Sequence, residues 1–394
     1  MDEVRIGIAG LGRRSLQWIN LLQKVPGYRI TAVYDWIEPL QERALAGITY
    51  RGDVKVFSRY EDFLGYSGMD AVGLVVRQKE QGAMSAQALE AGKHVNAEDP
   101  AAFTMADCWR IVVDVERTGL VYNLAEQTRF WGFVDGWRKL VREGRLGRIT
   151  YAEGQYLGYY GTRHYFQDFK TGRQYTVEEL PDHPEAKPTW INVRPQICSI
   201  SFDLSILLKV LDDRVTEVTA MSTKQPSYTH PQIEMADIQV ALMKTEKDTI
   251  IRMLIGQTQP RPDHHWWQVI GTKGSMEGPR SLRDKPKVWF ADGQMWDWAE
   301  VDWRYERTDA PPEARGSGHS DADYYVHAAF RDAVLKGEPL EFDVYKVMDT
   351  MGPALLGVDS IEEGGRLIQV PDFRPNADRP AGQMPKDLGG IGVR

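Results

Sequence analysis

The first fifteen residues constrain the fold of this chain more than any other stretch. Residues 4–9 form a short, mostly apolar run that is long enough for one buried strand, and Gly10-Leu11-Gly12 interrupts it. From Arg13 onward, apolar residues recur at the spacing of a helix. A strand, a glycine turn and a helix in this order predict the first half of a mononucleotide-binding unit.

The small residues of this turn each have a physical role in such a unit. Gly10 permits the tight turn, Gly12 lets the backbone approach a pyrophosphate, and Ser15 is small enough for the helix to pack on the strand. The free N–H groups at the start of the helix would hold the pyrophosphate. We therefore expect Gly10, Gly12, Arg13 and Arg14 to bind a dinucleotide cofactor.

Asp35 bears on which nicotinamide dinucleotide is bound. It ends a second predicted strand, residues 28–34, and an acid at this place can accept both ribose hydroxyls of NAD. Trp36 follows it, where an NADP site more often has an arginine. Because Arg13 and Arg14 are within reach of a 2′-phosphate, the sequence favours NAD and leaves NADP open.

The composition argues against several classes of function. The chain has 394 residues, enough for two domains, and its net charge of −8 argues against a nucleic-acid or anionic-membrane partner. No apolar run approaches the length of a membrane span, and the N-terminus lacks the apolar segment of a signal peptide. Cys108 and Cys198 provide neither a disulfide framework nor a set of metal ligands. We expect a cytoplasmic protein without a metal site.

Two patterns of predicted elements divide the chain. Residues 1–125 alternate short apolar strands with helices, which predicts an α/β domain with a doubly wound parallel sheet of the Rossmann type. Residues 126–373 contain several longer strands in succession, which predicts a second α/β domain with a large, mostly antiparallel open sheet. Within it, residues 159–195 predict a long, ordered loop over the site. Residues 374–394 predict an extended tail.

A family resemblance rests on six short stretches: GIAGLG (7–12), ALEAGKHV (88–95), EDPAA (98–102), GRLGRI (144–149), GTKGS (271–275) and VPDF (370–373). In this order and spacing they are similar to the Gfo/Idh/MocA oxidoreductase family. The resemblance implies a Rossmann domain followed by an open-sheet α/β domain, with NAD or NADP bound between them next to a sugar, cyclitol or related substrate. It also implies a homo-oligomer, a dimer or tetramer, formed through the second sheet.

Residues 98–109, EDPAAFTMADCW, resemble most closely a subgroup of this family with the sequence E-V-P-A-A followed by D-C-W. The subgroup includes the NAD-dependent glycosidases of the α-N-acetylgalactosaminidase type. In these enzymes a bound NAD transiently oxidises the sugar, the ketone acidifies a neighbouring proton, and elimination breaks the glycosidic bond. Water addition and return of the hydride complete the cycle.

Two positions depart from the family pattern. Most family dehydrogenases have Glu-Lys-Pro, in which the Lys helps to polarise the reacting hydroxyl, whereas this chain has Asp99 there. The family also places a His early in the helix after the long loop, and the corresponding position here is Ile197. The usual acid–base residues are therefore absent from their expected positions, although the cofactor turn is intact.

Three side chains are candidates for the chemistry instead. Asp99 follows a parallel strand at the edge where such sheets bind ligands, so it can act as a base, hydrogen-bond the substrate or cap a turn. Tyr156 lies on the first predicted strand of the second domain, and His164 lies in the long loop and titrates near neutrality. Oxidation of a carbinol requires a base for the hydroxyl proton or a group that holds the oxygen.

Further residues are predicted to bind cofactor or substrate. We expect Glu98 and Gln127 to contact the cofactor, and Arg194 to clamp an anionic group of the substrate or to form a structural ion pair. Because side chains alternate along a strand, only one of His264 and His265 can face the pocket. The remaining candidates for substrate binding are Tyr165, His264 and His319.

Three hypotheses about function follow. The first is an NAD-dependent oxidoreductase that acts on a carbinol of a sugar, cyclitol or glycoside. The second is a glycosidase or lyase that uses tightly bound NAD in a transient oxidation–elimination cycle. The third is a non-catalytic family member that acts as a binding or assembly subunit. The glycine turn and Asp35 favour the first two, and the missing Lys and His keep the third open.

Overall fold

The N-terminal part of the chain folds around a parallel sheet. The computed structural model describes residues 2–159, 161–281 and 283–394. The six strands of this sheet are β1 (Val4–Ala9), β2 (Tyr28–Tyr34), β3 (Lys55–Phe57), β4 (Ala71–Leu74), β5 (His94–Glu98) and β6 (Tyr122–Ala125). They lie in the order β3-β2-β1-β4-β5-β6, so the winding of the chain reverses between β1 and β4. The predicted Rossmann-type sheet is confirmed.

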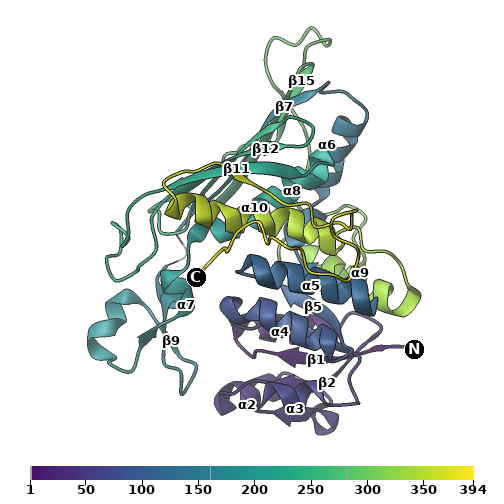
Figure 1. The fold of residues 1–394 in the computed structure, drawn as a ribbon, viewed down its shortest axis with the longest axis vertical. Coiled ribbons are helices and arrows are strands. Elements are labelled where there is room, and N and C mark those ends of the chain that lie inside the picture. Colours follow the sequence, from purple (N-terminus) through teal and green to yellow (C-terminus); the bar gives the residue numbers. More distant parts are fainter. Residues whose placement is uncertain (1, 160, 282) are drawn as a thin grey trace.

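Helices cover both faces of this sheet, which is why its central strands β1 and β4 are apolar except for Arg5. The helices are α1 (Arg13–Leu22), α2 (Glu38–Ala46), α3 (Tyr60–Leu64), α4 (Gln78–Glu90) and α5 (Met105–Thr118). One core joins alternate residues of β1 to α1 and α2, and another joins β4 and β5 to α4 and α5. Figure 1 shows α4 and α5 above the purple strands, with α2 and α3 below them.

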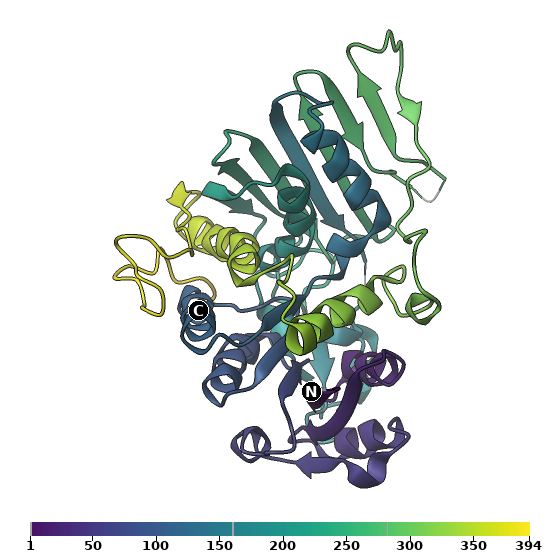
Figure 2. The same ribbon diagram turned by 90° about the vertical axis from the view of Figure 1, so that its right-hand side faces the viewer.

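The second sheet is larger and mostly antiparallel, as predicted. Its order is β17-β16-β15-β14-β7-β13-β12-β11-β18, and the parallel pair is β7 with β13. The strands are β7 (Ile149–Leu157), β11 (Val215–Ser222), β12 (Gln239–Thr245), β13 (Ile250–Gly256), β14 (His264–Gly271), β15 (Gly274–Glu277), β16 (Lys287–Phe290), β17 (Ala299–Glu300) and β18 (Ile368–Gln369). Figure 2 shows this sheet fanning away from the N-terminal domain.

Helices α6 (Gly132–Arg142), α8 (Ser201–Leu211) and α10 (Val344–Glu362) pack on one face of the second sheet. Helix α8 is buried along its whole length because it lies between the sheet and neighbouring helices. A further helix, α9 (Ala322–Lys336), leaves this domain and packs on the N-terminal sheet. The chain therefore crosses between the domains more than once. Within the described residues, no helix has both the length and the apolar character that a membrane span requires.

The segment predicted as a long loop is an ordered insertion. It holds a small sheet in the order β10-β8-β9, formed by β8 (Phe166–Gln167), β9 (Gln174–Tyr175) and β10 (Lys187–Pro188), followed by the short helix α7 (Trp190–Val193). Its side chains form a separate small core with two residues from beyond the insertion. The core residues are Tyr165, Phe166, Tyr175, Val177, Ile233 and Met235.

The C-terminal tail runs back along the N-terminal domain. Arg379 pairs with Glu116 of α5 at 2.8 Å, and both side chains are buried. Gly392 forms a backbone bridge with Thr104, which caps the start of α5. The tail is extended, and these contacts fix it to the first domain.

Candidate active site

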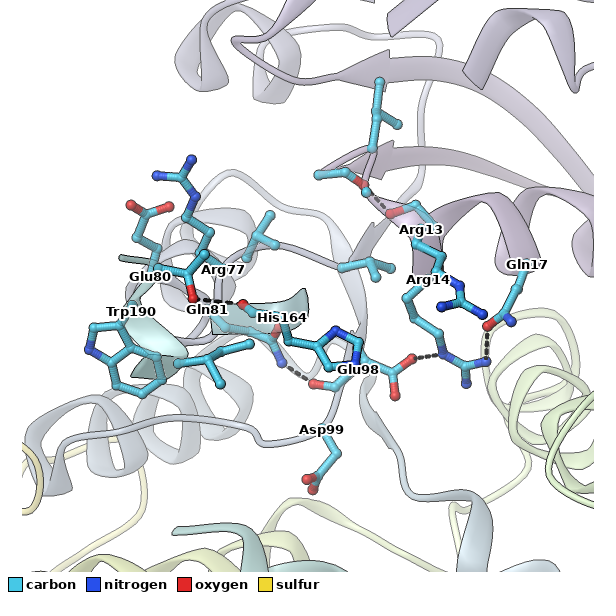
Figure 3. Close-up of a pocket in the computed structure, with 18 of the residues that line it drawn as sticks. Arg13, Arg14, Gln17, Arg77, Glu80, Gln81, Glu98, Asp99, His164 and Trp190 are labelled. Atoms are coloured by element: carbon cyan, nitrogen blue, oxygen red, sulfur yellow. Dashed lines mark hydrogen bonds and ion pairs between the residues drawn. The ribbon is translucent and has the colours of Figure 1, made fainter. Parts of the chain in front are cut away.

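A cavity of about 850 Å³ lies at the carboxyl ends of the parallel strands, where α/β sheets bind ligands. The glycine turn and the ends of β2, β4 and β5 line it from the first domain. The insertion, β7, α8 and the start of β14 line it from the second. Figure 3 shows the glycine-turn arginines on one side of this cavity, and Trp190 of the insertion on the other.

The glycine turn has the geometry that a pyrophosphate requires. Gly10 has a φ of +81°, and a Cβ at this position would lie 2.4 Å from the carbonyl oxygen of Val75. Gly12 is the N-cap of α1, lines the cavity and has open space where a Cβ would be. No side chain caps this end of α1. Its free N–H groups and positive dipole are available to an anion in the cavity, so the residues present fit a dinucleotide.

Asp35 lies at the adenosine end of the predicted cofactor site and holds the glycine turn in place. Its buried carboxylate accepts the backbone N–H of Leu11 at 2.8 Å and that of Ile37 at 2.9 Å. Because each carboxylate oxygen has more than one lone pair, Asp35 can still accept ribose hydroxyls from the cavity that it lines. Asp35 is therefore among the residues whose positions fit a bound NAD.

Glu98 is the centre of a hydrogen-bond network behind the pyrophosphate site. Its carboxylate accepts from Arg14 at 2.7 Å, from Trp18 at 2.9 Å and from Gln127 at 3.1 Å. Arg14 also pairs with Asp323 of α9 at 2.7 Å. Arg14 is thus engaged by two carboxylates, which argues against its use for a 2′-phosphate, whereas Arg13 has no ion pair within the described residues. Figure 3 shows Arg14 directed toward Glu98.

Asp99 lines the cavity but has little access to solvent. Only 3% of Asp99 is exposed. Within the described residues, neither of its carboxylate oxygens has a hydrogen-bond partner of ordinary geometry. The Ser201 side chain is near enough to lower the pKa of Asp99 slightly. Burial and the neighbouring charge of Glu98 raise the pKa of Asp99 well above its ordinary value, and Arg194 offsets this only in part. The raised pKa favours the protonated form of Asp99, in which the carboxyl can donate a hydrogen bond.

A histidine–carboxylate pair forms the second-domain side of the cavity. The Nδ1 atom of His265 lies 2.9 Å from Oδ1 of Asp203, which is fully buried at the start of α8. The His265 ring stacks on Tyr156 at 4.0 Å between centroids. Burial disfavours the charged ring, but the Asp203 carboxylate outweighs this and raises the pKa of His265. Because Nδ1 contacts Asp203, Nε2 is the ring nitrogen that can hydrogen-bond a group in the cavity, which His265 lines.

Comparisons with known proteins agree with this architecture. Residues 4–126 match the family described as oxidoreductase family, NAD-binding Rossmann fold. The N-terminal domain is that of a Gfo/Idh/MocA oxidoreductase. Residues 213–377 match the C-terminal domain of glycosyl hydrolase 109, so the predicted resemblance to this family and its glycosidase subgroup is confirmed in both domains.

Full-length relatives extend the match. Glycosyl hydrolase family 109 protein 2 of Phocaeicola vulgatus is 26% identical over 395 residues, which covers 94% of each chain. Levoglucosan dehydrogenase in complex with NADH and levoglucosan has a TM-score of 0.73 at 16% identity, over 94% of this chain and 100% of that one. Scyllo-inositol dehydrogenase from Lactobacillus casei with NAD(H) and scyllo-inositol has a TM-score of 0.68 at 18% identity, over 93% and 99%. The two solved structures show the same fold.

Of the two adjacent histidines on β14, His265 is the one that lines the cavity. His264 was the predicted substrate contact, but it does not line the cavity, and its buried Nε2 has no hydrogen-bond partner within the described residues. Strand alternation required that only one of the two face the pocket, and the choice depended on which face of β14 packs against α8. The local sequence does not contain that information.

Two other predicted substrate contacts lie outside the cavity lining. Arg194 is buried, and its guanidinium donates to Ser199 and to Gln257 at 3.0 Å. Tyr165 belongs to the small core of the insertion. Both residues therefore stabilise the wall of the site in this structure, because their side chains are enclosed by protein.

The remaining predicted residues are brought to the cavity. Tyr156, His164, His319 and Gln127 all line it. Burial lowers the pKa of His164, with smaller contributions from Arg13 and Arg194, so its ring is neutral at pH 7. The Nδ1 atom of His319 lies 2.8 Å from Oδ1 of Asp323, and Arg14 donates a hydrogen bond to the same carboxylate.

The position of the family histidine has no acid–base group. Ile197 is fully buried against α10, and Phe202 is the nearby residue that reaches the cavity. Asp203, which follows Phe202 directly, was not among the residues predicted from the sequence. The available signal was an acid within the mostly apolar stretch 197–211, because a buried carboxylate needs a partner. Among the described residues, no group of His, Cys, Asp and Glu could hold a metal ion.

Proposed function

We propose that the chain binds NAD in this cavity and oxidises a carbinol of a sugar, cyclitol or glycoside. The observation that carries the proposal is the His265–Asp203 pair, stacked on Tyr156, in the cavity that the glycine turn lines from the other domain. The levoglucosan and scyllo-inositol dehydrogenases support a polyhydroxylated substrate, because they were solved with levoglucosan and with scyllo-inositol, each together with a nicotinamide dinucleotide.

In this proposal the residues of the second domain handle the proton of the substrate hydroxyl. Neutral His265 accepts that proton at Nε2, and Asp203 holds the ring in position and stabilises the imidazolium that forms. The Tyr156 hydroxyl and the protonated Asp99 carboxyl donate hydrogen bonds to substrate oxygens at the same cavity. Bound NAD supplies the acceptor for the hydride of the carbinol carbon.

A second candidate function is a glycosidase or lyase in which NAD is oxidant and reductant within one cycle. The match of residues 213–377 to the C-terminal domain of glycosyl hydrolase 109 favours it. So does Asp99, because a protonated buried carboxyl can donate a proton to a departing glycosidic oxygen. The two functions need the same cofactor and differ in whether reduced cofactor leaves the protein.

The experiment that separates them incubates the purified chain with NAD and a panel of inositols, anhydrosugars and aryl glycosides. Net NADH formation supports the oxidoreductase, and release of the aryl group without net NADH supports the glycosidase. Replacement His265→Gln should abolish either activity, whereas His264→Gln, one residue along the strand and outside the cavity lining, should leave it unchanged. Binding of NAD without turnover of any compound would favour the non-catalytic hypothesis.

We also propose that the chain forms a homo-oligomer through the outer face of the second sheet. Met221, Leu242 and Ile250 are exposed on the neighbouring strands β11, β12 and β13 of that face, opposite the helices, and Ile270 is exposed on β14 beyond β7. A cluster of exposed apolar side chains on a sheet is typical of an interface. Replacement Leu242→Glu should lower the mass measured by light scattering in solution, and an unchanged mass would count against this interface.

A further inference from the structure

The turn between β8 and β9, residues 168–173, carries the insertion onto the far end of the cofactor cavity. Phe169 in this turn lies under the guanidinium of Arg77, 4.5 Å from the ring centroid. The same guanidinium lies 4.9 Å from the ring of Trp36, which follows Asp35 and lines the cavity. A residue of the second domain thus contacts the arginine that covers the adenosine end of the predicted cofactor site. Figure 1 shows the insertion, labelled β9 and α7, beside the N-terminal domain.

A second contact joins this turn to helix α2. Gly172 has a φ of +73°, and a Cβ there would lie 2.7 Å from Cδ2 of Leu40. Leu40 is buried and lines the same cavity. The turn therefore approaches the first domain at two points, Arg77 after β4 and Leu40 on α2, and both border the place where Asp35 would hold a ribose.

The turn is built to hold its shape. The Asp168 carboxylate accepts the backbone N–H of Lys170 at 2.8 Å and the hydroxyl of Thr171 at 2.6 Å. The Asp168 carbonyl accepts the N–H of Gly172 at 2.8 Å. At its base, Gln167 and Gln174 are cross-strand partners that both line the cavity. Both strands of the hairpin therefore contribute a side chain to the cavity lining.

We infer that the β8–β9 hairpin completes an adenosine subsite in which the exposed Trp36 ring receives the adenine, Phe169 holds Arg77 beside that ring, and the second domain closes over the subsite. The inference rests on the proposed function, because it assumes a dinucleotide in the cavity. Adenine suits this place because a flat heteroaromatic ring stacks on an indole plane. The dinucleotide is then held by both domains, and its release requires the hairpin to separate from Arg77.

The test compares ligands that contain or lack adenosine. Replacement Phe169→Ala should weaken binding of NAD and of ADP-ribose by about three- to thirtyfold and accelerate NAD release, because one cation–π contact behind Arg77 is lost. Binding of nicotinamide mononucleotide should be unchanged. The matched control is Phe290→Ala. It removes a similar contact, in which the Arg145 guanidinium lies 4.6 Å from the Phe290 ring centroid, and neither residue lines the cavity. Titration calorimetry and stopped-flow displacement measure these quantities without turnover.

Three outcomes overturn the inference. They are unchanged affinity for NAD and ADP-ribose in the Phe169 variant, equal weakening for nicotinamide mononucleotide, and equal weakening in the Phe290 control. The variant Phe169→Leu keeps the apolar volume and removes the ring, so it serves if the alanine variant does not fold. Failure of the unaltered chain to bind NAD or ADP-ribose overturns the proposed function as well, whereas binding that is insensitive to Phe169 overturns this inference alone.

Discussion

The two ends of the cavity are built in different ways. The proposed pyrophosphate and ribose end is formed by Gly10, Gly12 and Asp35, which lie within one strand–helix–strand unit. The proposed reacting end is formed by side chains from four separate segments, Asp99, Tyr156, Asp203 and His265. A local motif was enough to predict the first end, and the second came into view only when β7, α8 and β14 were placed beside β5.

The largest effect is expected at the local end, from Gly10→Ala. The positive φ and the close approach of Val75 leave no room for a Cβ, so the free energy of unfolding should fall by about 3 kcal/mol or more. NAD binding should be lost with it. Urea denaturation and calorimetric titration measure the two effects, and a variant of unchanged stability would show that the turn is less constrained than its geometry indicates.

Gly12→Ala sharpens the same comparison by separating binding from stability. A Cβ on Gly12 meets no atom within 4 Å, so unfolding should change by no more than about 0.5 kcal/mol. The methyl group would project toward the place of the pyrophosphate, and NAD affinity should fall by at least about tenfold. If affinity is retained, the pyrophosphate does not lie against this turn.

At the reacting end, Asp203→Asn tests whether the carboxylate tunes His265. Asp203 raises the pKa of His265, and a base works only when deprotonated, so activity should rise with pH through that raised pKa. Without the carboxylate the pKa of His265 falls, and the acidic limb of the rate profile should move to lower pH, with a maximum rate reduced by about tenfold or more. A pH–rate profile that keeps its acidic limb would assign that limb to another group, such as His164.

The smallest effect concerns the stability of the buried Asp99. Its pKa is raised in the folded protein, so the folded state binds the proton more tightly and loses stability as pH rises above the unfolded-state pKa. Asp99→Asn cannot ionise and should therefore be more stable than the unaltered chain at pH 8. The difference should shrink toward pH 4 in urea denaturation, and a less stable variant at pH 8 would indicate a partner for the charged carboxylate.

Several parts of the site were predictable because they depend on short-range chemistry. The glycine turn, the acid at the end of β2 and the lack of an acid–base side chain at Ile197 follow from residue type and spacing. The departure at Asp99 was also evident, although its role as a base was the interpretation that burial now disfavours. Residue type gives a side chain its chemistry, whereas its pKa depends on what surrounds it.

Other assignments depended on how the elements pack, and the structure places these residues away from the cavity lining. His264 and His265 are equivalent in a strand pattern, and only the packing of β14 beside α8 brings the second to Asp203. Arg194 and Tyr165 have the side chains of substrate-binding residues, but neighbouring segments enclose them. A solvent-facing and an enclosed residue of the same type cannot be told apart by sequence spacing.

The sequence by itself determined the two-domain architecture, the dinucleotide turn and the family resemblance. Each follows from periodicity or from a few adjacent residues, where backbone geometry and side-chain size act over one or two turns of chain. Only the tertiary structure decided which histidine faces the cavity, that Arg14 is committed to Glu98 and Asp323, and that the insertion reaches Arg77. These contacts join residues far apart in the chain, and their formation depends on how the sheets, helices and insertion pack together.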